Sequence, residues 1–207
     1  MLKPLSGLIW GYEKIESYII EELPKKMKNT APDNIISPDL HLAGPLLESL
    51  KYTGNKESLR SMYLNLLSTS MDKELAKSAH PAFVEVIRQL SCDEAKLLTH
   101  LKGGRRYPEI DSERITSTWF HFEPYESIKR RFYTLCKNAE LELPDSYLSY
   151  FDNLSRLNIL EFRQVSGDIT IKDKKHGRDM SIEQETNEYL LVTNFGQNFI
   201  DACLNDE

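Results

Sequence analysis

Two short stretches rich in β-branched and aromatic residues lie near the C-terminus, and their order restricts the fold more than any other feature of the chain. They cover residues 159–165 and 189–192 and have the composition of strands. The intervening residues 166–188 are polar and hold two short strand-like pieces. Thr193 is a favourable N-cap for a helix over residues 194–204. The tail therefore predicts a strand, a hairpin, a strand and a closing helix.

The first ninety residues show repeated helical patterns. Apolar residues recur there at spacings of three and four, which places them on one face of a helix. Pro and Gly separate the segments from one another. Gly44-Pro45 falls inside one segment, which can therefore be one helix or two. The expected helices cover residues 5–29, 39–52, 56–70 and 81–90.

A second group of elements begins at Ser91. Ser91 and Glu94 have the spacing of a capping box, which predicts a helix from residue 92 to residue 102. Two more helical patterns precede the C-terminal strands, over residues 126–138 and 144–157. The division of the chain is therefore expected near Ser91.

These elements predict a mainly α (α+β) fold, with a helical domain at residues 1–90 and a winged-helix-like domain at residues 91–207. The net charge is −6. Residues 1–91 hold 11 Lys+Arg and 11 Asp+Glu, whereas residues 92–207 hold 15 and 21. A nucleic-acid-binding domain usually has a basic face. The acidic C-terminal half therefore argues against DNA as its main partner.

The cysteine content and the hydropathy indicate a cytoplasmic location. Cys92, Cys136 and Cys203 are too few for a disulfide framework, which points to a reducing compartment. No apolar run approaches the roughly 20 residues needed to span a bilayer. No cofactor is expected, because the chain has no CxxC motif and no His at ligand spacing from a Cys. A membrane partner is not expected either, because the first helix carries several glutamates on its polar face.

Two segments of the sequence are distinctive. One runs from Leu64 to Ala95 and contains His80-Pro81-Ala82-Phe83, and the other runs from Tyr150 to Leu160 and is followed by Thr193-Asn194-Phe195-Gly196. Over nearly the whole chain they resemble the Abi-alpha family of bacterial proteins, which is linked by name to abortive infection of phage. The resemblance implies a context of phage defence. It implies no catalytic residues, because the family has no established ones.

Two basic clusters are candidate contacts to a nucleic acid or to a protein partner. One lies in the polar segment between the strands, where a hairpin tip could touch phosphate. The other lies on an expected helix. Such charge runs are more often solvated surface, and Asp145 and Asp152 make the helix before the hairpin unfavourable for contacts to DNA bases. The clusters are Lys172, Lys174, Lys175, His176 and Arg178 in the hairpin, and Lys129, Arg130 and Arg131 in the helix.

The sequence contains no pattern typical of a catalytic or metal site. His80 has no carboxylate or Cys at a supporting spacing, and His41, His100 and His121 are isolated in the same way. We therefore predict a non-enzymatic interaction or sensor protein that acts through a protein partner or self-association, in phage defence according to the resemblance. A winged-helix DNA-binding regulator is the alternative. An enzyme whose site is assembled from distant residues is a third possibility.

Overall fold

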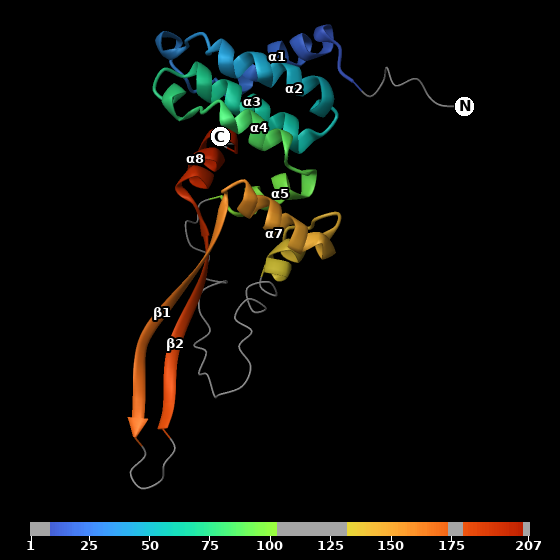
Figure 1. Cartoon of the computed structure of the whole chain (residues 1–207). Coiled ribbons are helices and arrows are strands. Elements are labelled where there is room, and N and C mark those ends of the chain that lie inside the picture. Colours follow the sequence, from blue (N-terminus) through green and yellow to red (C-terminus); the bar gives the residue numbers. More distant parts are fainter. Residues whose placement is uncertain (1–8, 103–131, 174–179, 205–207) are drawn as a thin grey trace, which may run out of the picture. The chain divides into compact units, whose positions relative to one another are not determined.

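The computed structural model describes residues 9–102, 132–173 and 180–204, and side chains at 9–102, 132–162 and 190–204. The described part is mainly helical with one two-stranded sheet, as the sequence predicts. The chain forms two compact units (Figure 1). The first unit comprises residues 1–102 and 197–207, and the second comprises residues 103–196. The predicted division into domains at residue 90 stays a prediction.

The first unit is built from helices. The second element, α2, is one continuous helix although it contains Pro45. Leu42 and Leu46 lie on either side of Pro45 and are both buried, so packing compensates for the backbone hydrogen bond that a proline cannot donate. The helices are α1 Tyr12–Lys26, α2 Leu40–Thr53, α3 Glu57–Met71, α4 Ala82–Arg88, α5 Cys92–His100 and, from Gln197 on, α8 Asn194–Cys203, with 3₁₀ turns at Pro32–Asn34 and Ala76–Ser78.

The central helix of this unit is α3, which contacts α1, α2, α4 and α5. Its residues Leu59, Met62 and Tyr63 are almost completely buried. Phe83 of α4 meets Phe199 of α8 edge to face, with ring centroids 5.4 Å apart. The last part of α8, from Gln197 on, therefore belongs to the core formed by the N-terminal helices.

Side chains of the first unit donate hydrogen bonds to the carbonyl groups at the C-terminal end of α8. The last carbonyl groups of a helix have no partner within the helix. The Asn65 side chain donates to the Cys203 carbonyl at 3.0 Å, and the Thr69 hydroxyl donates to the Ala202 carbonyl at 3.0 Å. Lys102 donates to the Leu204 carbonyl at 2.8 Å. The first two of these hydrogen bonds explain why the polar residues Asn65 and Thr69 of α3 are buried in the core.

The second unit contains a helical stretch at 132–138, a 3₁₀ turn at Pro144–Ser146, α7 Tyr147–Arg156, and the antiparallel strands β1 Leu160–Asp173 and β2 Met180–Val192 (Figure 1). Phe132 packs edge to face on Phe151 of α7, with ring centroids 5.5 Å apart. The strands pair from Leu160↔Val192 to Asp173↔Met180, with one irregularity between Ser166 and Ile169. The sequence predicted shorter, interrupted strands, whereas the pairing forms one continuous ribbon.

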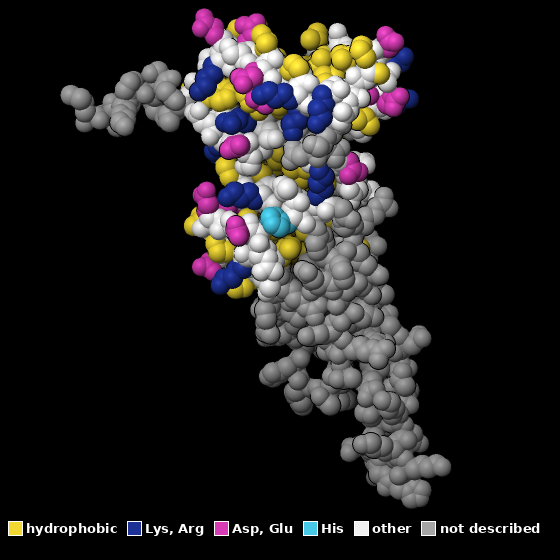
Figure 2. Space-filling model, turned by 180° about the vertical axis from the view of Figure 1, so that it is seen from behind, with side chains coloured by type: hydrophobic (Ala, Val, Ile, Leu, Met, Phe, Trp, Pro, Cys, Tyr) yellow, Lys and Arg dark blue, Asp and Glu magenta, His cyan; other side chains and the backbone are white. Residues whose placement is uncertain are grey.

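Some large apolar side chains are exposed on the first unit. They include Tyr12 and Ile20 of α1 and Leu40 of α2, which are 73%, 68% and 83% exposed. On the face drawn in Figure 2, hydrophobic side chains lie among Lys, Arg, Asp and Glu side chains. Single exposed apolar residues are normal on protein surfaces. None of the helices described is both long enough and apolar enough to cross a membrane.

Candidate functional site

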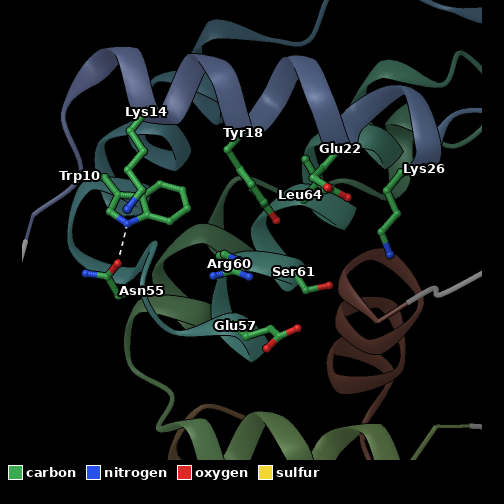
Figure 3. A pocket seen from close by; sticks show the side chains of 10 residues that line it. All are labelled: Trp10, Lys14, Tyr18, Glu22, Lys26, Asn55, Glu57, Arg60, Ser61 and Leu64. Atoms are coloured by element: carbon green, nitrogen blue, oxygen red, sulfur yellow. Dashed lines mark hydrogen bonds between the residues drawn. The ribbon is translucent and has the colours of Figure 1, made fainter.

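A groove of about 640 Å³ lies between α1 and α3 in the first unit (Figure 3). One wall is a stripe of side chains spaced four residues apart. It begins at Trp10, shortly before α1, and continues along one face of α1. The other wall comes from the start of α3 and the turn before it. The groove is lined by Trp10, Lys14, Tyr18, Glu22, Lys26, Asn55, Glu57, Arg60, Ser61 and Leu64.

Trp10 fixes one end of this groove. Its indole Nε1 donates to the Asn55 side-chain oxygen at 2.6 Å, and its backbone N–H donates to the Lys51 carbonyl at 2.9 Å. The ring lies so close to Gly54 that a Cβ added there would be 2.2 Å from the indole. Gly54 is therefore required for the indole to pack against the turn between α2 and α3. Trp10 is only 6% exposed as a result.

Two cations lie over the aromatic rings of the groove. The Lys14 ammonium is 4.5 Å from the centroid of the Trp10 ring. The Arg60 guanidinium is 5.9 Å from the Trp10 centroid and 5.6 Å from that of Tyr18, and it donates to the Gly54 carbonyl at 3.1 Å. All three cation–ring distances are in the range of cation–π attraction. Arg60 is therefore held between a carbonyl group and two aromatic side chains.

The hydroxyl group of Tyr18 is partly removed from water. Burial raises the pKa of Tyr18 above its usual value, and the nearby positive charge of Arg60 opposes this effect. Tyr18 also meets Trp10 edge to face, with centroids 5.4 Å apart. The two aromatic side chains at this end of the groove are thus uncharged and pack on each other. The positive charge at this end comes from Lys14 and Arg60.

The opposite end of the groove carries the carboxylates Glu22 and Glu57 together with the Ser61 hydroxyl (Figure 3). Glu22 accepts a hydrogen bond from Lys25 at 2.7 Å. The end away from Trp10 therefore carries two carboxylates, with the Lys26 side chain beside them. The sequence did not identify this site, although the spacing of Trp10, Lys14 and Tyr18 was visible as one face of the first helix.

A second constellation lies where α7 meets β1. The residue after α7's C-cap, Asn158, has a φ of 56°, a conformation that Asn tolerates better than most residues. The Ile159 N–H donates to the Leu154 carbonyl and the Asn158 N–H to the Ser155 carbonyl, both at 2.9 Å. This is a Schellman motif. It ends α7 and turns the chain directly into β1.

Thr193 joins this turn to the start of α8. Its hydroxyl donates to the Asn158 carbonyl at 2.5 Å and accepts from the Gly196 N–H at 2.8 Å, and its own N–H donates to the Ile159 carbonyl at 3.0 Å. A Cβ at Gly196 would lie 2.3 Å from the Ile159 carbonyl oxygen. The predicted cap at Thr193 is confirmed. The residues Asn158, Thr193 and Gly196 therefore hold both ends of the ribbon together.

A hollow of about 620 Å³ lies beside this junction. Its lining includes Asn158, Glu161, Thr193, Asn194 and Phe195. The described polar groups of the junction already hydrogen-bond to one another. The distinctive residues near the C-terminus therefore have a structural explanation as the closure of the ribbon.

Most of the basic residues selected from the sequence lie outside the described part of the chain. Lys172 is in β1 opposite Ser181, but its side chain is not described. The remaining members of the two clusters are Lys174, Lys175, His176 and Arg178, and Lys129, Arg130 and Arg131. Their role as partner or nucleic-acid contacts stays a prediction.

The rings of two described histidines, His80 and His100, make local contacts at helix ends. The His80 ring accepts from the Ala82 N–H at 3.1 Å, and the His100 ring contacts the Lys96 carbonyl at 3.1 Å. Burial raises the pKa of the Cys203 thiol well above its usual range. In the described ranges, no three His, Cys, Asp or Glu side chains are grouped as a metal site requires.

A comparison with protein families agrees with the resemblance seen in the sequence. The family description "abortive infection alpha" (Abi-alpha) matches residues 12–203 of the chain. Searches of the curated proteins and of the solved structures gave no match. The matched range contains α1, the groove residues of α3, the Asn158–Thr193 junction and α8. Because it covers nearly the whole chain, this protein belongs to the abortive infection alpha family.

Proposed function

We propose that the protein is a non-enzymatic interaction or sensor component of phage defence, which self-associates through the β1–β2 ribbon. The family supports the defence context. The proposal of self-association rests on the β1–β2 ribbon. Its strands are 14 and 13 residues long, and within the described chain they form a sheet of only two strands.

A ribbon of this kind has unused backbone hydrogen-bonding capacity. An isolated two-stranded hairpin is at best marginally stable in water, and each outer edge presents a row of N–H and C=O groups. α7 contacts β1, and Leu160 and Leu190 are buried near the base of the ribbon. A third strand added to the ribbon would pair with the edge N–H and C=O groups that lie beyond this base. Strand addition is a common mode of protein recognition.

The charges of the strands favour the β1 edge for contact with a second copy. β1 carries both signs, with Glu161, Arg163, Asp168, Lys172 and Asp173. β2 carries three acidic residues and no basic ones. Like charges on directly paired strands destabilise a sheet, whereas opposite charges stabilise it. An antiparallel β1–β1 pair is therefore favoured over a β2–β2 pair, and it gives a dimer with two-fold symmetry.

Two shortened ribbons test this proposal. In the first variant, Asn-Gly replaces residues 167–185 and joins the paired residues Ser166 and Thr186. In the second, Asn-Gly replaces only residues 174–179 and joins the paired residues Asp173 and Met180. Asn-Gly is the preferred sequence of a two-residue hairpin loop. Circular dichroism would confirm that both variants retain their helices.

Light scattering after size-exclusion chromatography gives the readout. We expect a concentration-dependent dimer for the parent chain and for the second variant, and a monomer for the first variant. A parent chain that stays monomeric at high concentration would contradict the proposal. So would a first variant that dimerises as strongly as the parent.

The same variants test the DNA-binding alternative. The winged-helix prediction rests on the order helix, strand, strand and helix, which α7, β1, β2 and α8 follow. The second variant lacks Lys174, Lys175, His176 and Arg178. DNA binding that falls with salt and is lost in this variant would support a regulator in place of self-association. We expect no binding at low salt, because the C-terminal half of the chain is acidic.

A further inference from the structure

We propose that the groove between α1 and α3 binds a small molecule that has an anionic group at one end and hydrogen-bond donors at the other. The anionic group, a phosphate or a carboxylate, contacts Lys14 and Arg60. Hydroxyl or amino groups of the ligand contact Glu57 and Ser61. This site is separate from the proposed self-association, and it does not depend on it.

The contacts of the two groove cations differ from those of three ion-paired cations on the described surface. Lys25, Lys51 and Arg88 each pair with a carboxylate three or four residues away on the same helix. Lys14 and Arg60 form no such ion pair with any described carboxylate. Their described contacts are ring faces and one carbonyl group. Among the described residues, no carboxylate therefore lies within ion-pair distance of either positive charge.

Arg60 is also held in place before any ligand arrives. A guanidinium group has five N–H donors in a fixed plane, and the recorded hydrogen bond of Arg60 uses one of them for the Gly54 carbonyl. The Trp10 and Tyr18 rings restrict its remaining freedom. A side chain restrained in this way loses less entropy when it binds an anion. A planar donor group of this kind suits both phosphate and carboxylate.

The carboxylates at the other end of the groove limit the class of ligand. Glu57 and Glu22 disfavour a polyanion such as a nucleic-acid strand as the occupant, although Lys26 also lines this end. They can accept hydrogen bonds from hydroxyl or amino groups. A volume of about 640 Å³ lies within the range of small-molecule sites. The ligand class is therefore a polar metabolite with one phosphate or carboxylate group, of about the size of a nucleoside monophosphate.

Trp10 provides a probe of this site. The chain has two tryptophans, so a Trp119→Phe background leaves Trp10 as the only one. Adenosine monophosphate, L-glutamate and inorganic phosphate are titrated separately at constant ionic strength, and the Trp10 emission is recorded. Isothermal calorimetry on the same proteins measures Kd independently of the emission. The nucleotide and glutamate arms distinguish a phosphate from a carboxylate as the anionic group.

Lys14→Gln is the informative variant, because Lys14 is exposed and its removal should leave the fold intact. Lys51→Gln is the matched control, because Lys51 is a helix-surface lysine whose side chain lies outside the groove lining. We expect saturable binding of at least one probe. Lys14→Gln should weaken it about tenfold, as expected for one charge-assisted hydrogen bond, and Lys51→Gln should leave it unchanged.

Arg60→Lys provides a second test that keeps the charge but removes the planar donor group. We expect weaker binding of the same probe. The proposal is overturned if none of the three probes binds saturably. It is also overturned if Lys14→Gln and Lys51→Gln have the same Kd as the parent.

Discussion

Thr193→Val tests the junction that holds the two ends of the ribbon together. Valine has nearly the shape of threonine and the same branching at Cβ, but it has no hydroxyl group. The substitution therefore removes the donation to the Asn158 carbonyl and the acceptance from the Gly196 N–H. It leaves the backbone hydrogen bond from Thr193 to the Ile159 carbonyl in place.

The expected loss follows from these two hydrogen bonds. The loss of a helix N-cap costs about 1 kcal/mol. A second hydrogen bond contributes about 1 kcal/mol. The free energy of unfolding should therefore fall by about 2 kcal/mol, and for a chain of this size that corresponds to a decrease in Tm of about 4–8 °C.

Thermal unfolding followed by circular dichroism measures the difference. Thr193→Ser is the control, because serine keeps the hydroxyl group and is an equally good N-cap. It should lose less than half as much stability as Thr193→Val. If the valine variant has a Tm within about 1 °C of the parent, or if serine is as destabilising as valine, the junction does not stabilise the fold in the way described.

Three further predictions concern the first unit. Gly54→Ala should displace Trp10 and lower the free energy of unfolding by about 1–3 kcal/mol, because the new Cβ would lie 2.2 Å from the indole; denaturant titration with Trp10 emission measures both effects. Burial raises the pKa of Tyr63 to about 12, so its phenol stabilises the fold below pH 10 and this contribution is lost as the pH rises through about 12. Denaturant titrations from pH 9 upward should therefore show a shallower decline for Tyr63→Phe than for the parent. Cys203 should resist alkylation at neutral pH in the native protein while the partly exposed Cys92 reacts; mass spectrometry of the labelled protein measures this, and equal labelling would contradict the burial of Cys203.

The sequence predicts local helix caps well, because each is specified by its own residues. The capping box at Ser91 and Glu94 is confirmed, with both of its hydrogen bonds present. The cap at Thr193 is confirmed in the same way. A short side chain that satisfies a nearby N–H group requires no knowledge of the rest of the fold.

The features that depend on distant contacts were not predicted. The ribbon is continuous because its two strands pair across residues whose polar composition alone indicates a loop. The groove depends on Gly54 and Asn55, which fix Trp10 although they lie far from it in the sequence. Asn65 similarly has the composition of a surface residue, but it lies in the core and donates to the Cys203 carbonyl. The hydrogen-bond partners of Trp10 and Asn65 lie 45 and 138 residues away along the chain.

Hydrogen exchange at the amides of β1 tests the proposed self-association most directly. The outward-facing N–H groups of β1 have no strand partner among the described residues, and in a single copy they should exchange rapidly. We predict that alternate amides in residues 160–173 become protected as the protein concentration rises, because a second copy pairs with this edge. Protection that does not change with concentration, or that increases on β2 and not on β1, would contradict the account.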